Sequence, residues 1–141
     1  MTQSINATGQ CLCKKVSIHA TKFVPHVDAC HCEMCRKWAG SALLAVDCGQ
    51  EVTFEGQQHI TVFNSSEWAE RGFCQHCGTH LFYRLKQQQQ YIVPVGLLDI
   101  ESKLDFTTQI FIDEKPDYYD FANQTKTMTG AEVFAAFGGS D

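Results

Sequence analysis

The sequence of 141 residues lacks any long hydrophobic run, and this absence excludes one class of protein. No apolar stretch approaches the roughly 20 residues that a helix needs to span a bilayer. Hydrophobic residues make up 44% and charged residues 19% of the chain, which is typical of a globular protein and not of a disordered one. The N-terminus, MTQSINATGQ, also lacks the apolar segment of a secretory signal. We therefore expect a cytoplasmic protein, whose thiols stay reduced.

Basic residues are also few. Eleven Lys and Arg stand against 16 Asp and Glu, so the formal net charge is −5. A nucleic-acid-binding protein needs a broad basic face that releases counterions from phosphates. Here the basic residues gather only in two short pairs, Lys14/Lys15 and Arg36/Lys37, which suffice for one small anion. We expect neither nucleic acid nor membrane as a partner, and the sequence leaves the oligomeric state open.

The chain contains no internal repeat and no Pro/Gly/Ser-rich linker, so we predict a single domain over residues 1–141. Short stretches rich in β-branched or alternating apolar residues are separated by turn residues, which favours a mainly β fold with antiparallel sheets. These stretches are KVSIHA, SALLAV, EVTF, HITVF, HLFYRL, YIVPVGLL and TTQIFID. The low-complexity patch QQQQ, Gln87 to Gln90, lies between two of them and indicates a hairpin tip.

Two short helices are predicted. Near the C-terminus, Thr129 and Glu132 have the spacing of a capping box before AEVFAAF, and Gly138 follows as a C-cap. We expect this helix to pack on the core. A second helical turn begins within CEMCRKWAG and ends at Gly40, which would lift the preceding cysteines out of a loop and direct their sulfurs to one point.

Cysteine, by contrast, is abundant, and seven of the eight cysteines fall into three clusters. Residues two apart on a strand point the same way, and a C-x-x-C turn brings its sulfurs together. Both arrangements can meet the roughly 3.8 Å sulfur separation of a tetrahedral zinc–thiolate site. We therefore predict zinc; the alternatives are a disulfide framework, which a reduced compartment disfavours, and exchanging redox thiols. The clusters are Cys11-x-Cys13, Cys30-x-Cys32-x-x-Cys35 and Cys74-x-x-Cys77.

Seven sulfurs divide into a group of four and a group of three. The C-x-C and the later C-x-x-C can clamp distant parts of a sheet in a closed, structural site. Cys30, Cys32 and Cys35 then form a second site with an open position, as expected of a catalytic zinc. Spacing alone does not prove this division, because Cys48 or His31 could also close the second site. His31 alternates with two cysteines and would tend to face away from their metal.

Four segments together resemble the glutathione-dependent formaldehyde-activating enzyme family. They are GQCLC at 9–13, CHCEMCRKWAGS at 30–41, SSEWAERGFCQHCGTHLFYR at 65–84 and QIFIDEKPDYYDF at 109–121. Two positions depart from the usual pattern: Lys14 stands where members commonly carry Gly, and Gln109 where His is frequent. The resemblance implies an Mss4-like fold of several small antiparallel β-sheets. It also implies two zinc sites, with Cys11, Cys13, Cys74 and Cys77 on the structural ion and Cys30, Cys32 and Cys35 on the second.

The resemblance further implies a carbon–sulfur lyase that condenses glutathione with formaldehyde or a related small electrophile. Glutathione carries two carboxylates, and Arg36 and Arg71 are the cations we expect to bind them. Trp38 and Phe73 are candidates for pocket walls, although core packing is the commoner role of such residues. The proton for the adduct could come from Glu33, His31 or water. Two alternatives remain: a non-catalytic, zinc-stabilised binding module, and thiol redox chemistry.

Overall fold

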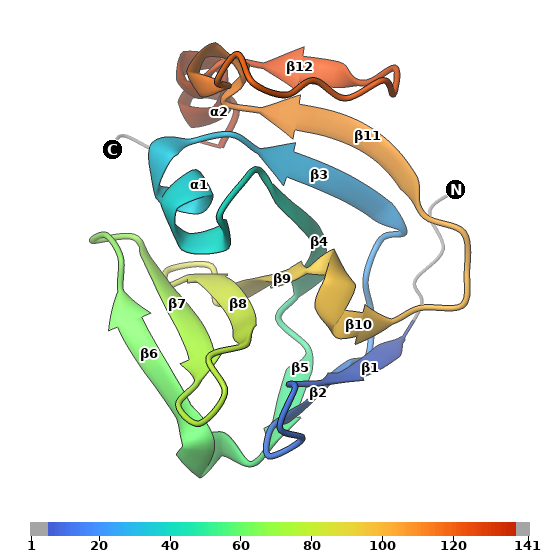
Figure 1. The fold of residues 1–141 in the computed structure, drawn as a ribbon, viewed down its shortest axis with the longest axis vertical. Coiled ribbons are helices and arrows are strands. Elements are labelled where there is room, and N and C mark those ends of the chain that lie inside the picture. The colour runs from blue at the N-terminus through green and yellow to red at the C-terminus, as the bar shows by residue number, and fades with distance from the viewer. Residues whose placement is uncertain (1–5, 138–141) are drawn as a thin grey trace. The chain divides into compact units, whose positions relative to one another are not determined.

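The computed structural model describes residues 6–137, which divide into two compact units (Figure 1). Within the described residues, the first unit comprises 6–25 and 45–103, and the second comprises 26–44 and 104–137. Each unit has its own strands and its own cluster of cysteines. The predicted mainly β fold with a short C-terminal helix is confirmed.

The first unit contains a four-stranded antiparallel sheet with the order β10-β1-β2-β5. Alternate residues are buried along β1 and along β2, as the period-two pattern of KVSIHA predicts for β2. The turn between these strands carries the first two cysteines. The bounds are β1 Ala7–Gln10, β2 Ser17–Ala20, β5 Val52–Glu55 and β10 Leu98–Asp99.

The same unit contains a second run of antiparallel strands in the order β4-β9-β8-β7-β6. The turn that joins β8 to β9 covers residues 86–89, so the predicted hairpin tip at QQQQ is confirmed. Two 3₁₀ turns, η1 Gln57–His59 and η2 Val95–Leu97, belong to this unit. The strand bounds are β4 Leu43–Gly49, β6 Ile60–Asn64, β7 Ala69–Cys74, β8 His80–Leu85 and β9 Gln90–Pro94. The first two residues of β4 belong to the second unit by sequence position.

An aromatic cluster fills part of the core of the first unit. The ring of Phe82 lies 5.4 Å from that of Phe54 and 5.1 Å from that of Tyr91, centroid to centroid. Phe82 covers the backbone of Gly72 on the neighbouring strand so closely that a Cβ at Gly72 would clash with the ring. The glycine of RGFC therefore lets an aromatic ring pack against strand β7, which ends at Cys74.

The second unit differs from the prediction in strand direction. Strand β11 (Asp105–Ile110) pairs in parallel with both β3 (His26–Cys30) and β12 (Lys126–Met128), whereas the sequence predicted antiparallel sheets. The physical reason is the long connections, because parallel strands need a crossover of a dozen or more residues and the chain supplies them here. Alternation of apolar residues is the same in both directions, so it cannot reveal which one is adopted.

Both predicted helices are present in the second unit. Helix α1 (Glu33–Ala39) ends at Gly40, which adopts the left-handed conformation with φ of 89° and donates its N–H to the Arg36 carbonyl. Helix α2 (Gly130–Phe137) begins with the predicted capping box, in which Thr129 and Glu132 exchange hydrogen bonds of 2.8 and 3.2 Å. The predicted C-cap Gly138 lies outside the described residues. A 3₁₀ turn, η3 Ile112–Glu114, completes this unit.

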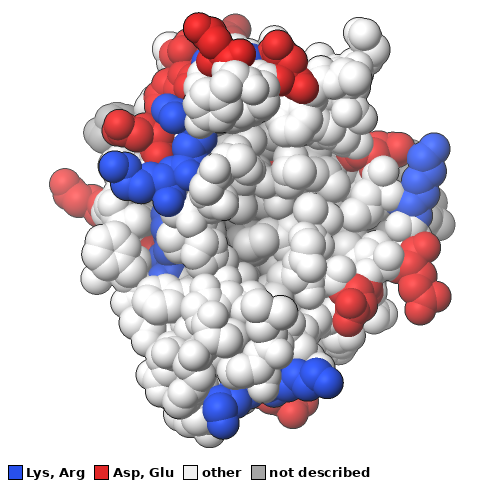
Figure 2. Space-filling model, in the orientation of Figure 1, with Lys and Arg blue, Asp and Glu red and all other residues white. Residues whose placement is uncertain are grey.

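Two surface features complete the description of residues 6–137. No helix in that range is long and apolar enough to cross a membrane. On the face drawn in Figure 2, the Lys and Arg side chains lie in small groups, most of them with acidic side chains nearby.

Candidate metal centres

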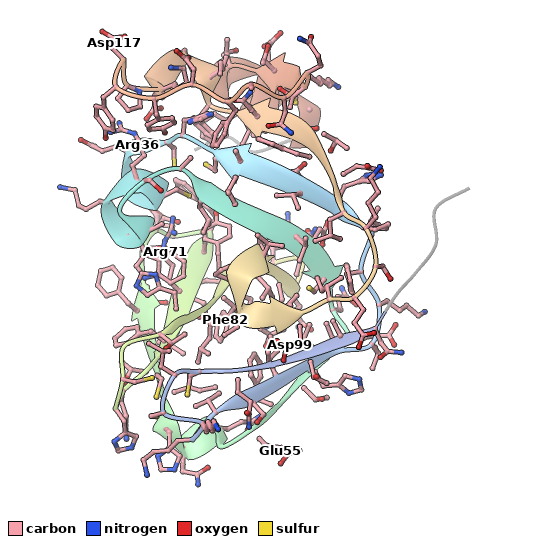
Figure 3. The ribbon with its side chains drawn as sticks, turned by 45° about the vertical axis from the view of Figure 1, so that its right-hand side comes forward. Arg36, Glu55, Arg71, Phe82, Asp99 and Asp117 are labelled. Carbon is pink, nitrogen blue, oxygen red and sulfur yellow. The ribbon has the colours of Figure 1, made fainter. Side chains whose placement is uncertain are left out.

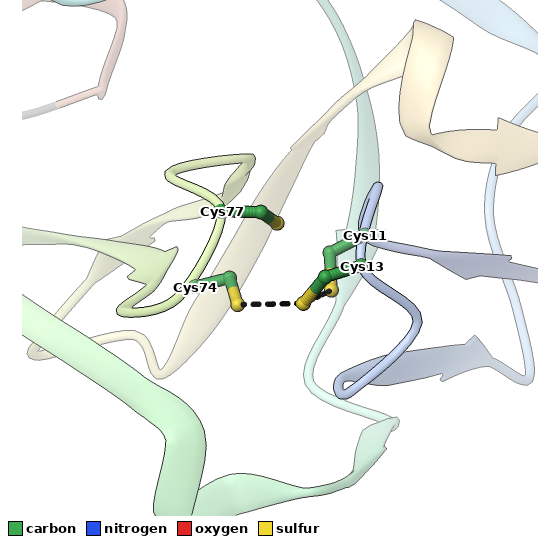
Figure 4. A group of neighbouring side chains, drawn as sticks. All are labelled: Cys11, Cys13, Cys74 and Cys77. Carbon is green, nitrogen blue, oxygen red and sulfur yellow. Dashed lines mark hydrogen bonds between the residues drawn. The ribbon is translucent and has the colours of Figure 1, made fainter.

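Four sulfurs meet in the first unit, contributed by Cys11, Cys13, Cys74 and Cys77 (Figure 4). All of their Sγ atoms lie within 4.8 Å of one another. The Sγ atoms of Cys11 and Cys13 are 3.7 Å apart, and those of Cys13 and Cys74 are 3.6 Å apart. Both separations far exceed the roughly 2.05 Å of a disulfide bond, and all eight cysteines of the chain are free thiols. The disulfide framework considered above is therefore absent.

The backbone around these cysteines holds the two turns in shape. The N–H of Cys11 donates to the Val16 carbonyl across the first turn, and that of Gly78 donates to the Cys74 carbonyl across the second, at 2.8 Å. Gly78 has a φ of 78°, which glycine adopts without steric cost. The N–H of Leu12 donates to the Thr79 hydroxyl at 3.1 Å and so ties the two turns together.

Hydrogen bonds also prepare two of the four sulfurs to act as thiolates. The Thr79 hydroxyl, 3.2 Å from Cys77 Sγ, lowers the pKa of the Cys77 thiol to about 5. The N–H of Val16 donates to Cys11 Sγ at 3.4 Å. Thiolates are the form of cysteine that binds metal, so these donors favour the ligating state at Cys77 and Cys11. The pKa of Cys13, by contrast, is raised to about 11: the backbone of Lys15 lowers it, but burial and the neighbouring sulfurs raise it more.

The four-sulfur cluster fits a zinc ion. Tetrahedral zinc–thiolate bonds of about 2.3 Å place the sulfurs roughly 3.8 Å apart, close to the 3.6 and 3.7 Å observed here. Cys11 and Cys74 are buried at 2% and 0% exposure, so the centre is shielded on their side. Four cysteine sulfurs fill all four positions of a tetrahedral zinc ion, and such a donor set is typical of a closed structural site.

Three further sulfurs meet in the second unit, at the point where β3 passes into α1. Cys30 ends β3, Cys32 is the N-cap of α1, and Cys35 lies in the first turn of the helix; their Sγ atoms lie within 4.8 Å of one another. Cys32 Sγ accepts a hydrogen bond from the N–H of Cys35 at 3.4 Å. The helix predicted within CEMCRKWAG is thus the element that brings this cluster together.

The three-sulfur cluster also has the chemistry of a metal site. The neighbouring sulfurs of Cys32 and Cys35, aided by burial, raise the pKa of the Cys30 thiol. Three neighbouring thiolates repel one another, so without a cation this crowding keeps the thiols protonated. A bound metal cation would neutralise the charge and lower their pKa values instead. Among the described residues, no His, Asp, Glu or further Cys groups with these three sulfurs as a fourth donor.

His31, which lies between two of these cysteines, does not join the cluster. Its ring is fully buried, and both ring nitrogens are engaged: Nδ1 lies 2.8 Å from the Tyr119 hydroxyl and Nε2 lies 2.8 Å from Gln109 Oε1. Gln109 Nε2 donates to the Thr125 hydroxyl, so Oε1 accepts from His31 Nε2–H, and Nδ1 accepts from Tyr119. Burial lowers the pKa of His31, which keeps the ring neutral.

Sequence reasoning missed Tyr119 and Lys115 as neighbours of this cluster. Burial raises the pKa of Tyr119, so its hydroxyl stays a hydrogen-bond donor to His31. The ammonium of Lys115 lies 5.4 Å from the centroid of the Tyr119 ring and donates to the Tyr119 carbonyl. Tyr119 and His31 are 88 positions apart, and no spacing rule joins residues at that distance. Both missed residues lie in DEKPDYYDF, which only the family resemblance singled out.

The two arginines expected to bind carboxylates lie in different units and surroundings (Figure 3). Arg36 projects from α1, beside Cys35 in the chain, and its Nε donates to the His31 carbonyl at 2.8 Å. Arg71 lies on β7 and is only 3% exposed, with its guanidinium 4.7 Å from the centroid of the Tyr83 ring. Of the two, Arg36 is the one that shares a unit with the three-sulfur cluster.

Cys48 belongs to neither cluster. It lies on β4 at 1% exposure, and burial raises the pKa of its thiol to about 12. These are the properties of a small buried apolar side chain, the commoner role of an isolated cysteine.

The fold and the clusters define a class: a mainly β protein with a closed four-sulfur centre and a separate three-sulfur centre. The sequence pattern of the glutathione-dependent formaldehyde-activating enzymes matches residues 6–114. The chain therefore belongs to this family, as the resemblance predicted.

Two relatives and one solved structure support the assignment. An uncharacterized lyase of Schizosaccharomyces pombe is 37% identical over 126 residues, which cover 89% of this chain and 92% of that protein. A Podospora anserina protein with the provisional name of glutathione-dependent formaldehyde-activating enzyme is 33% identical over 90 residues, 60% of this chain and 42% of its own length. The crystal structure of a Rhodobacter sphaeroides protein superposes with a TM-score of 0.58 at 20% identity, over 71% of this chain and 99% of that one. This last similarity concerns the fold alone.

Proposed function

We propose that the protein is a zinc-dependent carbon–sulfur lyase that joins glutathione to formaldehyde, or to a related small electrophile, in a reversible reaction. The observation that carries the proposal is the three-sulfur cluster of Cys30, Cys32 and Cys35, which groups with no fourth His, Cys, Asp or Glu among the described residues. A zinc site with three protein ligands keeps a position for a substrate. Membership of the family and the names of the two relatives agree with this assignment.

The chain's part in the reaction is to hold and orient the reactants. Zinc, when bound, supplies a positive charge that keeps a thiol deprotonated near neutral pH. In the forward direction the glutathione sulfur forms a bond to the aldehyde carbon, the C=O π bond breaks, and its electron pair moves to oxygen, which takes up a proton. In reverse, the carbon–sulfur bond breaks and the proton leaves.

Recognition of glutathione requires a cation near the three-sulfur cluster. Arg36 meets this requirement within the second unit, because its Nε is held by the His31 carbonyl while the rest of the guanidinium can bind a carboxylate. Arg71 would have to become accessible first, since it is 3% exposed. We therefore assign the larger share of carboxylate binding to Arg36.

The surroundings of His31 argue against this residue as the source of the proton. Its ring is fully buried, and Tyr119 and Gln109 already occupy both nitrogens, so it is poorly placed to exchange a proton with a substrate. Glu33, in the first turn of α1, is exposed. We propose that Glu33 or a water molecule transfers the proton.

Exchange NMR on the zinc-loaded protein tests the proposal. Cross-peaks between hydrated formaldehyde and its glutathione adduct measure the rate of exchange directly, and we expect the protein to accelerate it. Cys35→Ser, which removes one ligand of the three-sulfur cluster, should abolish the acceleration and leave the four-sulfur centre loaded. A rate equal to that of the uncatalysed reaction, with glutathione failing to bind at millimolar concentration, would refute the proposal and favour the non-catalytic binding module.

A further inference from the structure

A second group of metal-binding side chains lies in the first unit, outside both sulfur clusters. His76 Nε2 lies 2.9 Å from His59 Nδ1, and the two rings are 4.7 Å apart between centroids at an interplanar angle of 64°. The side-chain amide of Gln75 lies 3.4 Å from the same His76 nitrogen. His76 Nε2 is thus the shared partner of two other polar side chains, and His76 and Gln75 are exposed to solvent there.

The backbone fixes this arrangement. The N–H of Gln75 donates to the His59 carbonyl at 2.8 Å, which ties the turn η1 to the turn between Cys74 and Cys77. The N–H of His59 donates to the carbonyl of Gly56, whose φ of 82° starts η1. Both imidazoles therefore project from short turns that are tied to each other, which limits the entropy that would be lost on binding a common ligand.

The hydrogen-bonding capacity of the group points to a cation. An imidazole nitrogen carries either one proton or one lone pair, so His76 Nε2 cannot fully satisfy both His59 and Gln75. A metal ion bound between the two imidazoles would instead accept the lone pairs of both nitrogens and, after a half-turn of the Gln75 amide, of its side-chain oxygen.

The distance between the nitrogens suits such an ion. Two nitrogen ligands at about 2.0–2.1 Å and at right angles to each other lie roughly 2.9 Å apart, which is the separation of His59 Nδ1 and His76 Nε2. Right-angled ligands are typical of square-planar or octahedral ions, and imidazole suits borderline transition metals. We propose that His59 and His76, with Gln75, form a binding site for a divalent transition-metal ion such as nickel(II) or copper(II).

This site is independent of the proposed lyase reaction. His76 lies within the same short turn as Cys74 and Cys77, so an ion on the two imidazoles would link η1 to the turn that supplies half of the four-sulfur cluster. The proposal concerns a third location for metal, made of nitrogen and oxygen donors and facing solvent.

Nickel(II) is the appropriate probe, because it is paramagnetic and prefers nitrogen ligands at right angles. The full chain, with its cysteine clusters saturated with zinc, is titrated with nickel(II) by calorimetry and by NMR of the histidine side chains. We expect one bound ion and selective broadening of the His59 and His76 ring signals. His59→Gln and His76→Gln should each weaken binding by about tenfold or more.

His19→Gln is the matched control, because His19 is an exposed histidine of the same unit, on β2. It should leave nickel(II) affinity unchanged. Zinc content and circular dichroism of each variant report whether the cysteine clusters and the fold persist, and the broadening in the unmodified protein tests the site even if one variant fails to fold. Equal affinity in all three variants, broadening spread evenly over the histidines, or equal competition by magnesium would overturn the proposal.

Discussion

At the scale of single residues, Lys14 stands out because its backbone does not suit its side chain. It follows Cys13 in the turn of the four-sulfur cluster and has a φ of 68°, in the left-handed region that disfavours residues with a Cβ. Gly would adopt this conformation without steric cost, so it would suit the position better than Lys. The turn brings the sulfurs of Cys11 and Cys13 into one cluster, and the chain accepts the strain there.

Lys14→Gly should therefore stabilise the protein. We expect the free energy of unfolding of the zinc-loaded chain to rise by about 1 kcal/mol, because Gly adopts a positive φ without a clash. Urea denaturation measures the change. Lys15→Gly is the matched control, since its φ is not positive, and it should have no stabilising effect. If Lys14→Gly did not raise the free energy of unfolding above that of Lys15→Gly, this explanation would be contradicted.

Cys48 gives the protein a predictable response to alkaline pH. Burial raises the pKa of its thiol to about 12, whereas the thiol of the unfolded chain ionises near pH 9. Between these values the unfolded chain has lost the proton that the folded chain keeps, so the free energy of unfolding should fall as pH rises. Below about pH 9 the thiol is protonated in both states and its contribution is fully present.

The comparison of wild type with Cys48→Ala isolates this contribution. Urea denaturation at about pH 8 and about pH 10.5 should show a larger loss of stability with pH in the wild type than in the variant. The variant should be less stable at the lower pH, because it removes a buried sulfur from β4 and leaves a cavity. The same pH slope in both proteins would show that Cys48 titrates as an exposed thiol does.

At the scale of elements, the link between β3, β11 and α1 positions the three-sulfur cluster. The N–H of His31 donates to the Ile110 carbonyl of β11, and its ring is held by Gln109 on the same strand. The Arg36 side chain of α1 donates to the His31 carbonyl. Each bond fixes the short segment that carries Cys30 and Cys32, so the positions of two sulfurs depend on a histidine that does not ligate.

Gln109→Leu tests this positioning role. It leaves the buried Nε2–H of His31 without an acceptor, which should lower the free energy of unfolding by about 1–3 kcal/mol. We also expect cobalt(II) to bind more weakly to the three-sulfur cluster, as followed by the sulfur-to-cobalt charge-transfer absorption, while the four-sulfur cluster is unaffected. The control is Asp105→Asn, an exposed change on the same strand. Unaltered cobalt affinity at both clusters would mean that Gln109 only packs the core.

Much of this element-level structure could be predicted from local sequence signals. Gly40 marks the end of α1, Thr129 and Glu132 mark the start of α2, and the glutamine run marks the β8–β9 turn, because each depends on residues a few positions apart. The parallel direction of β11 could not be predicted, since alternation is blind to strand direction. Nor could the contact of His31 with Tyr119, which only the folded chain creates.

The candidate metal sites, too, could be predicted only where nearby residues in the sequence form the site. The C-x-C and C-x-x-C spacings single out the seven clustered cysteines, and alternation with Cys30 and Cys32 predicts that His31 faces away from them. The pair of His59 and His76 escaped sequence reasoning, because the two residues come from separate turns 17 positions apart.

At the scale of the whole molecule, the prediction of one domain over residues 1–141 can be tested through the two tryptophans. Trp38 lies in the second unit and Trp68 in the first, so Trp38→Phe and Trp68→Phe each leave a fluorescent reporter in one unit. In a single domain, the fluorescence transition of each variant in urea should coincide with the transition that circular dichroism reports for the same variant. Two separate midpoints, each matching only part of the dichroism change, would instead show two domains.

X-ray absorption at the zinc edge tests the central claim most directly, namely that the three-sulfur cluster offers zinc a position for the glutathione thiol. On addition of millimolar glutathione to the two-zinc protein, the mean number of sulfur neighbours per zinc should rise by about one half, because one of two sites gains one sulfur. Cys11, Cys13, Cys74 and Cys77 would keep their complete set throughout. A sulfur count that glutathione leaves unchanged would contradict the account.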